Sequence, residues 1–232
     1  MKTIRTKSIL LASVVVALAG SAMAQDQTGQ NMGTGSGEMS PAATSVATAT
    51  DALSLAAWAR ESQDAEAMLV AARMLASVGT LGEGEEPEAT TDSTAEGSAT
   101  GSPPTAAALF DEAVELAEGD PAIIERVSAA RSQASRGLVG GAVSWVRDIS
   151  ARSSVSYQMT PRGGYVWNVV AAGDGDTDVD MDVFDQNGNL VCRDIRVSSR
   201  ASCSLTPAWT GPFTVRISNL GGVWTRTLVM SN

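Results

Sequence analysis

The amino-acid composition changes abruptly near residue 142, and this change constrains the fold more than any other feature of the 232-residue chain. Residues 25–141 hold 18 acidic residues and five arginines, with runs of Ala, Leu, Met and Glu that favour helices. Residues 142–232 hold eight acidic residues and eight arginines. In this part Val, Thr, Ser and aromatic residues dominate, and turn signals recur about every 8–12 residues. We therefore predict a multi-part α+β chain, in which α-helical hairpins precede a C-terminal all-β sandwich.

The N-terminus has the pattern of a secretory signal. Three cations in residues 1–7 precede an apolar run from Ile9 to Ala19, and small residues follow in the sequence Ala22-Met23-Ala24. The apolar run is about 11 residues long, whereas a membrane span needs roughly 20. We therefore expect cleavage between Ala24 and Gln25, with an uncleaved N-terminal anchor as the alternative. The mature protein is then expected to be periplasmic or secreted, with no membrane span.

The absence of two residue types narrows the chemistry. The chain has no His, and it has no Lys after residue 24. These absences exclude Ser-His-Asp and Cys-His catalysis, His-ligated metals and Schiff-base chemistry. The mature chain opposes 13 arginines to 26 acidic residues, so nucleic acid is an unfavourable partner. We therefore expect a protein that is not an enzyme and does not bind nucleic acid.

Two segments of the acidic half predict helical hairpins. Residues 51–79 and 105–141 are each rich in helix formers, and each breaks before an aspartate that can cap a second helix, Asp64 and Asp120. A few apolar positions agree at an offset of 56 residues. Over about residues 51–137 the chain resembles degenerate tetratricopeptide-type helical hairpins. The alternative is a small bundle in which the two hairpins pair with each other.

Two other segments of this half have too few apolar residues to form a core. Residues 25–50 consist mainly of Gln, Gly, Ser, Thr and Ala, and we expect them to be disordered. Residues 80–104 carry six acidic residues among Gly, Ser, Thr and Pro, with no cation. Because like charges repel, this segment is predicted to be an extended, disordered linker, and residues 142–232 are predicted to fold on their own.

The strands of the second half can be placed by alternation, and an Asn187-Gly188 turn predicts a hairpin. The predicted strands are 165–171, 178–184, 189–193, 201–205, 213–218 and 223–230. Cys192 and Cys203 are expected to face inward on two of them. The chain has two cysteines, 11 residues apart, and in an exported protein this predicts a structural disulfide. The spacing excludes a CxxC redox motif.

Two stretches of the second half carry a family resemblance. GDGDTDVDMDVFDQNGNLVC, residues 173–192, joins an acidic loop to a D-x-D strand, a D-x-N-G turn and an apolar strand. With LTPAWTGPFTVRISNLG, residues 205–221, it resembles the bacterial pre-peptidase C-terminal domain, and the resemblance covers about residues 142–232. It implies a secreted, jelly-roll-like β-sandwich that assists secretion or binds substrate, and some members bind collagen or calcium. Such domains usually accompany a secreted hydrolase, whereas residues 25–141 contain nothing that could be a peptidase.

Alternating aspartates are the one constellation that could carry chemistry. Asp174, Asp176, Asp178, Asp180 and Asp182 lie within nine residues. Crowded carboxylates are tolerated when they are solvated or when a cation neutralises them, and calcium prefers such hard oxygen ligands. One interpretation is a solvated strand face that discourages edge-to-edge aggregation. The other is a calcium site whose ligands are Asp174, Asp176 and Asp178, since the glycine-containing loop can bring them together.

The sequence thus indicates an exported, non-enzymatic protein whose β-sandwich is a binding or interaction module. We expect a protein or polysaccharide partner in the envelope or extracellular space, and no certain cofactor besides the candidate calcium. The alternatives are a calcium-dependent carbohydrate- or surface-binding module, and an accessory component of a secreted hydrolase or secretion system. Four tryptophans could either stack on sugars or fill the core, namely Trp145, Trp167, Trp209 and Trp224.

Overall fold

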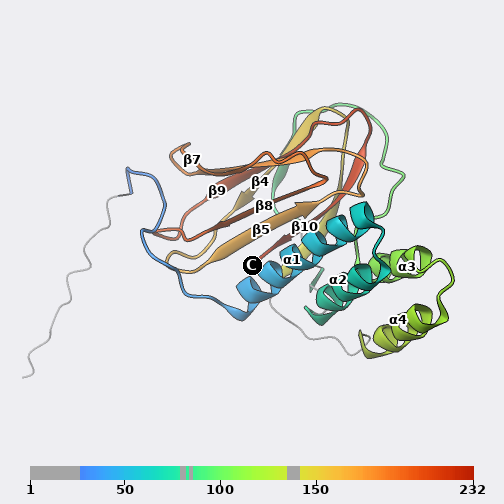
Figure 1. The fold of residues 1–232 in the computed structure, drawn as a ribbon. Helices are drawn as coiled ribbons and strands as arrows, with labels where there is room; N and C mark the ends of the chain where they lie inside the picture. The colour runs from blue at the N-terminus through green and yellow to red at the C-terminus, as the bar shows by residue number, and fades with distance from the viewer. Residues whose placement is uncertain (1–26, 79–81, 84–85, 135–141) are drawn as a thin grey trace, which may run out of the picture.

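A computed structural model describes residues 27–78, 82–83, 86–134 and 142–232 (Figure 1). The signal segment and the cleavage site between Ala24 and Gln25 lie outside the described residues, as does the end of the second predicted hairpin, residues 135–141. The described part contains four helices and ten strands.

The strands form two five-stranded sheets that face each other, as the β-sandwich prediction requires. In the first sheet the order is β1 (Gly82–Glu83), β3 (Val143–Ile149), β10 (Thr225–Ser231), β5 (Trp167–Ala172) and β8 (Arg200–Leu205). In the second it is β2 (Ala89–Thr91), β4 (Ser153–Met159), β9 (Phe213–Asn219), β6 (Val179–Asp185) and β7 (Leu190–Asp194). The pairings are antiparallel, apart from the parallel pair of β1 and β3.

The sequence prediction missed the strands β3 and β4, because the turn between them lacks the usual signals. This connection contains no Gly, Pro or Asn, and Arg152 adopts the left-handed conformation there with φ of 54°. Glycine is the residue that ordinarily takes such a conformation. Without a recognisable turn, the alternation of the two flanking strands could not be divided into separate elements.

Alternating apolar side chains from both sheets fill the space between them. Trp145 lies edge-to-face against Tyr157, and Trp167 lies edge-to-face against Phe213, each pair with ring centroids 5.3 Å apart. Both indoles are buried among the residues of this core. Trp145 and Trp167 therefore fill the core, and the alternative role as a sugar-stacking platform is not open to them.

The predicted disulfide between Cys192 and Cys203 is present. It connects β7, an edge of the second sheet, to β8, an edge of the first. Cys203 is buried, and Cys192 pairs with Val183 on the inner side of its sheet. The bond therefore closes one side of the sandwich covalently.

The four helices pack consecutively and lie on one side of the sandwich (Figure 1). They are α1 (Pro41–Ser62), α2 (Ala65–Ser77), α3 (Ala106–Leu116) and α4 (Pro121–Ala134). As predicted, Asp64 caps α2 by accepting a hydrogen bond from the Ala67 amide. Asp120, also predicted as a cap, precedes α4 and accepts a hydrogen bond from the Ala122 amide at 2.8 Å. Ser40 caps α1 and Thr105 caps α3.

Helix α1 begins at Pro41, within the segment that was expected to be disordered. The Ser40 hydroxyl accepts a hydrogen bond from the Ala43 amide, and proline suits the first helical turn. The helix buries a stripe of small residues that includes Ala43, Val46 and Ala49. Small side chains allow close approach to a sheet, but in the sequence they resemble low-complexity linker. The expectation of disorder over residues 25–50 is therefore wrong for the part that the structure describes.

The helices and the sandwich share a second hydrophobic core. The outer side of the first sheet contributes Val170, Ala172, Leu228 and Met230, which lie buried against the helices. The Asn168 side-chain amide also donates a hydrogen bond to the Ala43 carbonyl of α1, at 2.8 Å. Residues 142–232 were predicted to fold alone, but in the structure one face of their first sheet is completed by the helices.

The expected acidic linker lies along the sandwich where the structure describes it. Strand β2 pairs with β4, and Asp92 accepts hydrogen bonds from the Ser154 amide and hydroxyl at 2.7 Å. Glu86 forms an ion pair with Arg147 at 3.2 Å. The prediction of a mobile linker considered only the segment's own charges. The partners of those charges come from strands at least 50 residues away in the sequence, which composition cannot reveal.

Candidate functional site

The two outer faces of the sandwich differ in what covers them. The helices cover the first sheet, whereas no helix of the described part packs on the second (Figure 1). Polar side chains project from this uncovered surface, which we call the open face. Its central members come from four adjacent strands and are Ser154, Ser156, Gln158, Thr214, Arg216, Ser218, Asp180, Asp182, Phe184 and Arg193.

A row of three charges crosses the middle of the open face. Asp182 pairs in register with Arg216 on one side and with Arg193 on the other. Its carboxylate accepts a hydrogen bond from each guanidinium at 2.5 Å. Burial raises the pKa of Asp182, but the two arginines outweigh this effect and hold the pKa below its ordinary value. Asp182 is therefore an anchored carboxylate, while the side chains of Arg193 and Arg216 remain 48% and 42% exposed.

An apolar group lies beside this row. The Arg216 guanidinium stands over the Phe184 ring, 5.3 Å from its centroid. Leu190 pairs with Phe184 in register and is 37% exposed. Leu190 is two residues from the inward-facing Cys192, and simple alternation would place both on one face. A bulge at Val183 and Phe184 shifts the register by one residue and turns Leu190 outward.

Asp180 is the second carboxylate of the open face and has a different environment. Its register partner on β9 is Ser218, and its Oδ1 atom has no hydrogen-bond partner among the described residues. Burial raises the pKa of Asp180, and the nearby charges of Asp178 and Asp182 raise it further. The open face thus contains one carboxylate neutralised by two arginines and one that is not.

Of the three aspartates predicted as calcium ligands, Asp174 and Asp176 are neighbours in the structure, whereas Asp178 has another partner. Asp174 accepts hydrogen bonds from the Thr225 hydroxyl at 2.9 Å and the Arg226 amide at 3.1 Å. Asp178 accepts one from the Ser198 amide at 2.9 Å. Burial and the neighbouring Asp174 raise the pKa of Asp176. Across the described residues, no three acidic, Cys or His side chains gather in the manner of metal ligands.

The alternation of the aspartates was predicted correctly from Asp180 onward. Val179, Met181 and Val183 are fully buried, and Asp180 and Asp182 project from the other side of β6. Sequence reasoning did not find Arg193 and Arg216 as partners of Asp182. They lie 11 and 34 residues away, and the alternation of Arg216 with Val215 and Ile217 was the only signal that it projects outward.

The remaining two tryptophans do not belong to the open face. Trp209 and Trp224 are half-buried in the loops at opposite ends of β9. Gly97 lies close to Trp224, and Asn31 forms hydrogen bonds to the backbone of Trp209. The four tryptophans are therefore distributed between the core and two loops and form no common platform.

No family model matches the chain, and no curated protein matches it. Among solved structures, it is similar to the periplasmic inhibitor of g-type lysozyme from Aeromonas hydrophila, with 8% identity over 39% of this chain and 84% of that one, and a TM-score of 0.30. The Yersinia pseudotuberculosis-derived mitogen gives 12% identity over 39% and 84%, with a TM-score of 0.33. A carbohydrate-binding module of Cellvibrio mixtus lichenase 5A, bound to cellotriose, gives 11% identity over 36% and 72%, with a TM-score of 0.25. Likeness at this level does not extend to function.

Proposed function

We propose that the protein is an exported, non-catalytic binding protein that holds a neutral polysaccharide chain on its open face. The observation that carries this proposal is the uncovered sheet face, whose central charges balance and which has one further carboxylate, Asp92, beside Ser154. Two aspartates, Asp180 and Asp182, oppose two arginines, Arg193 and Arg216. A balanced face favours neither a polyanion nor a polycation, whereas a hydroxyl-rich ligand can both donate and accept hydrogen bonds across it.

The free hydrogen-bonding capacity of the face supports a polyhydroxylated ligand. Each guanidinium has five N–H donors, and the structure assigns one from each of Arg193 and Arg216 to Asp182. Asp182 holds both guanidinium groups in place, so less side-chain entropy is lost when a ligand binds. Leu190, which is exposed beside Phe184, provides an apolar surface for the C–H groups of a sugar ring.

The arrangement of the two carboxylates supports binding without hydrolysis. Cleavage of a glycosidic bond requires two carboxyl groups on either side of the bond, one of them protonated and positioned to donate. Asp180 and Asp182 instead project side by side from one strand. The two arginines keep Asp182 ionised. A sugar chain lying on this face would contact both groups from the same side.

Affinity electrophoresis tests the proposal. The mature protein is run in native gels that contain soluble β-glucan, xylan or galactan, and we expect at least one of them to retard it. Arg216→Ala should lower the affinity for the retarding polysaccharide about tenfold. The substitution removes a guanidinium that donates hydrogen bonds to the ligand and that contacts Phe184 and Asp182. Arg126→Ala is the matched control, since Arg126 lies on α4 and pairs with Glu66 away from the open face.

Three results would reject the proposal. The first is that none of the polysaccharides retards the wild-type protein. The second is that Arg216→Ala and Arg126→Ala behave alike. The third concerns catalysis: release of new reducing ends from a polysaccharide that is bound would show that the protein is an enzyme.

Among the described residues, no helix is both long and apolar enough to cross a bilayer. Export remains part of the proposal and rests on the signal-like N-terminus.

A further inference from the structure

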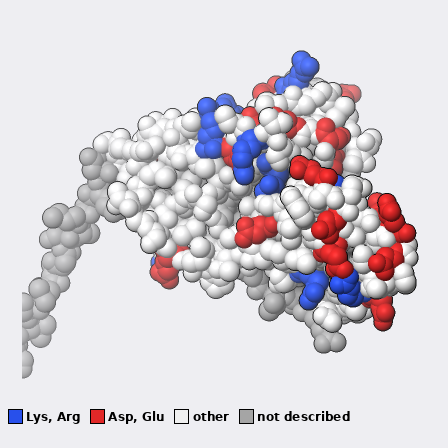
Figure 2. Space-filling view, viewed as in Figure 1, with Lys and Arg blue, Asp and Glu red and all other residues white. Residues whose placement is uncertain are grey.

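Residues 27–40, which we call the N-terminal strap, cross one end of the sandwich before α1 begins. The strap contacts the turns between β4 and β5, β6 and β7, and β8 and β9. Figure 2 shows few charged side chains over the end of the molecule from which the grey N-terminal trace departs. The strap is held there by hydrogen bonds rather than by ion pairs.

One side chain of the strap is completely enclosed. Asn31 has no exposed surface, and its amide nitrogen donates to Gln186 Oε1 at 3.2 Å and to the Trp209 carbonyl at 3.0 Å. Its amide oxygen accepts from the Trp209 backbone N–H at 3.0 Å. The Asn31 backbone N–H donates to Asp185 at 2.8 Å. This pocket is selective for a carboxamide side chain, because it supplies acceptors for the amide nitrogen and a donor for the amide oxygen.

The rest of the strap is held through its backbone. The Asn187 side chain donates to the carbonyls of Gln27 and Gly29 at 2.8 Å. Further along, Glu38 donates from its backbone N–H to Gly164 and accepts from Val166, both at 2.9 Å. Such contacts fix an extended chain without selecting its side chains.

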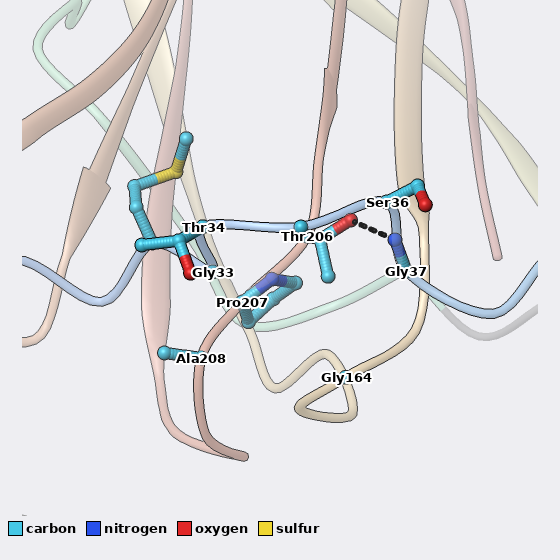
Figure 3. A pocket seen from close by; sticks show the side chains of 10 residues that line it. Gly33, Thr34, Ser36, Gly37, Gly164, Thr206, Pro207 and Ala208 are labelled. Carbon is cyan, nitrogen blue, oxygen red and sulfur yellow. Dashed lines mark hydrogen bonds between the residues drawn. The ribbon is translucent and has the colours of Figure 1, made fainter.

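The middle of the strap has glycines at alternate positions, Gly33, Gly35 and Gly37, and borders a cavity (Figure 3). A cavity of about 360 Å³ is lined by residues 32–37 on the strap and by Gly164 and Thr206–Ala208 on the sandwich. The Gly37 N–H donates to the Thr206 hydroxyl at 3.2 Å, and a Cβ atom on Gly37 would lie only 2.6 Å from Thr206. The glycines thus permit close approach at Gly37 and at Gly33, whose N–H donates to the Thr206 carbonyl at 2.7 Å. They also form a connector of low stiffness between Asn31 and α1.

We propose that this end of the sandwich is an asparagine-reading peptide site, which the chain's own strap fills and which can also accept the strap of a second copy of this chain. The contacts within one chain and between two copies are the same. Which one forms is then decided by the effective concentration of the tethered strap and by the freedom of its glycine connector. The proposal concerns a different end of the molecule from the open face and does not depend on polysaccharide binding.

A peptide added in trans tests the site. The recipient is the full mature chain with Asn31→Ala, which weakens its own strap, and the probe is a fluorescent synthetic peptide of residues 27–40. We expect the peptide to bind this recipient and to raise the fluorescence anisotropy. A peptide carrying Asn31→Asp should bind about tenfold more weakly or less, because a carboxylate cannot donate to Gln186 and the Trp209 carbonyl.

The wild-type chain is the competition control. Its tethered strap competes with the peptide, because a short flexible tether gives an effective concentration of about a millimolar. The wild-type chain should therefore bind the peptide at least tenfold more weakly than the Asn31→Ala recipient does. The proposal is overturned if the Asn31→Ala recipient binds neither peptide, or if it binds both equally.

A second variant keeps the test decisive if the Asn31→Ala chain does not fold. A protease recognition sequence inserted between Gly35 and Ser36 allows the strap to be cut after the wild-type chain has folded. The labelled peptide should then exchange with the cut strap, and unlabelled Asn31→Asp peptide should not block the exchange. Failure of any exchange would also overturn the proposal.

Discussion

At the scale of single residues, two aspartates on the same face of β6 have opposite effects on the stability of the folded state. Asp182 is held ionised by Arg193 and Arg216, and its pKa lies below the ordinary 3.8 in spite of burial. Asp180 projects from the same strand without an arginine partner, and burial together with nearby acids raises its pKa. One aspartate therefore stabilises the folded state at neutral pH and the other destabilises it, in proportion to the shift of each pKa.

The pair predicts opposite effects of a charge-neutral substitution. At pH 7 we expect Asp182→Asn to lower the free energy of unfolding by about 1–2 kcal/mol, since two half-exposed charged hydrogen bonds are weakened. Asp180→Asn should instead raise the melting temperature by about 1–3 °C, because it removes a carboxylate that folding makes harder to ionise.

The pH dependence separates the two cases. The stability supplied by Asp182 is present above its unfolded pKa and is lost as the pH falls below about 3.8 through the lower folded value. The cost of Asp180 disappears sooner, as the pH falls through its raised pKa. Thermal melts from pH 7 to pH 3 measure both effects, and a shift of both variants in the same direction at pH 7 would contradict the assignment.

At the scale of elements, the edges of the two sheets are closed by added strands on one side of the sandwich and by a disulfide on the other. On one side, β1 and β2 come from the acidic segment and pair with β3 and β4. On the other, the disulfide joins the edge strands β7 and β8. A covalent link at this position prevents the sheets from separating where no further strand of the described part covers them.

This position predicts a substantial loss on removal of the disulfide. We expect the double variant Cys192→Ala/Cys203→Ala to lose about 3 kcal/mol of unfolding free energy, as the entropy of an unfolded loop of this size implies. The melting temperature should then fall by roughly 6–12 °C. Urea and thermal unfolding with and without reductant measure the change. Reductant should lower the stability of the wild-type protein and leave the double variant unaffected, and equal stabilities of the two proteins without reductant would refute the prediction.

At the scale of the whole molecule, the chain folds around two cores that share the first sheet. Trp145 and Val229 face the core between the sheets, whereas Val170 and Met230 face the helices. Since neighbouring residues of one strand, Val229 and Met230, belong to different cores, loss of either core disturbs the strand that supports the other. The helical layer and the sandwich should therefore unfold together.

Cooperative unfolding is the expected result. Far-UV circular dichroism at 222 nm reports the helices. Tryptophan fluorescence reports the sandwich in a Trp58→Phe background, since Trp58 is an exposed residue of α1. The two thermal transitions should coincide in this background. Met230→Ala should lower both midpoints together, with a cost of about 2–5 kcal/mol for a buried side chain. Val223→Ala, at a half-exposed position, should change the free energy of unfolding by less than about 0.5 kcal/mol and leave both midpoints nearly unchanged. Two separate transitions in the wild-type protein would show that the layers are independent.

Local patterns in the sequence were enough for several elements of the fold. Period-two alternation located β6 and β9, and the Asn187-Gly188 turn located the hairpin of β6 and β7. The cap at Asp64 located the start of α2. The disulfide followed from the number and spacing of the cysteines. Each of these features depends on residues close together in the chain, where propensity and side-chain direction are sufficient.

The candidate site was predicted only in part. Alternation placed Asp180 and Asp182 on an outer face, but it could not give the arginines that neutralise one of them or the helices that leave this face uncovered. The apolar runs of residues 169–172 in β5 and 228–230 in β10 were a signal that both sides of the first sheet are buried, since strands covered on both faces lack apolar–polar alternation. That signal also argued against independent folding of residues 142–232.

The sequence by itself therefore determined the change from helical to β structure, the inner face of most strands and the covalent link. Only the tertiary structure showed that the polar segments, residues 27–40 and 86–104, are ordered on the sandwich. Their amides and carboxylates have no partners nearby in the sequence, and composition therefore favours disorder. Folding brings turns and strands 50 or more residues away into contact with them, as Asn31 and Asp92 show. A polar group is ordered by the partner that it meets, and the identity of that partner is set by strand register rather than by the local sequence.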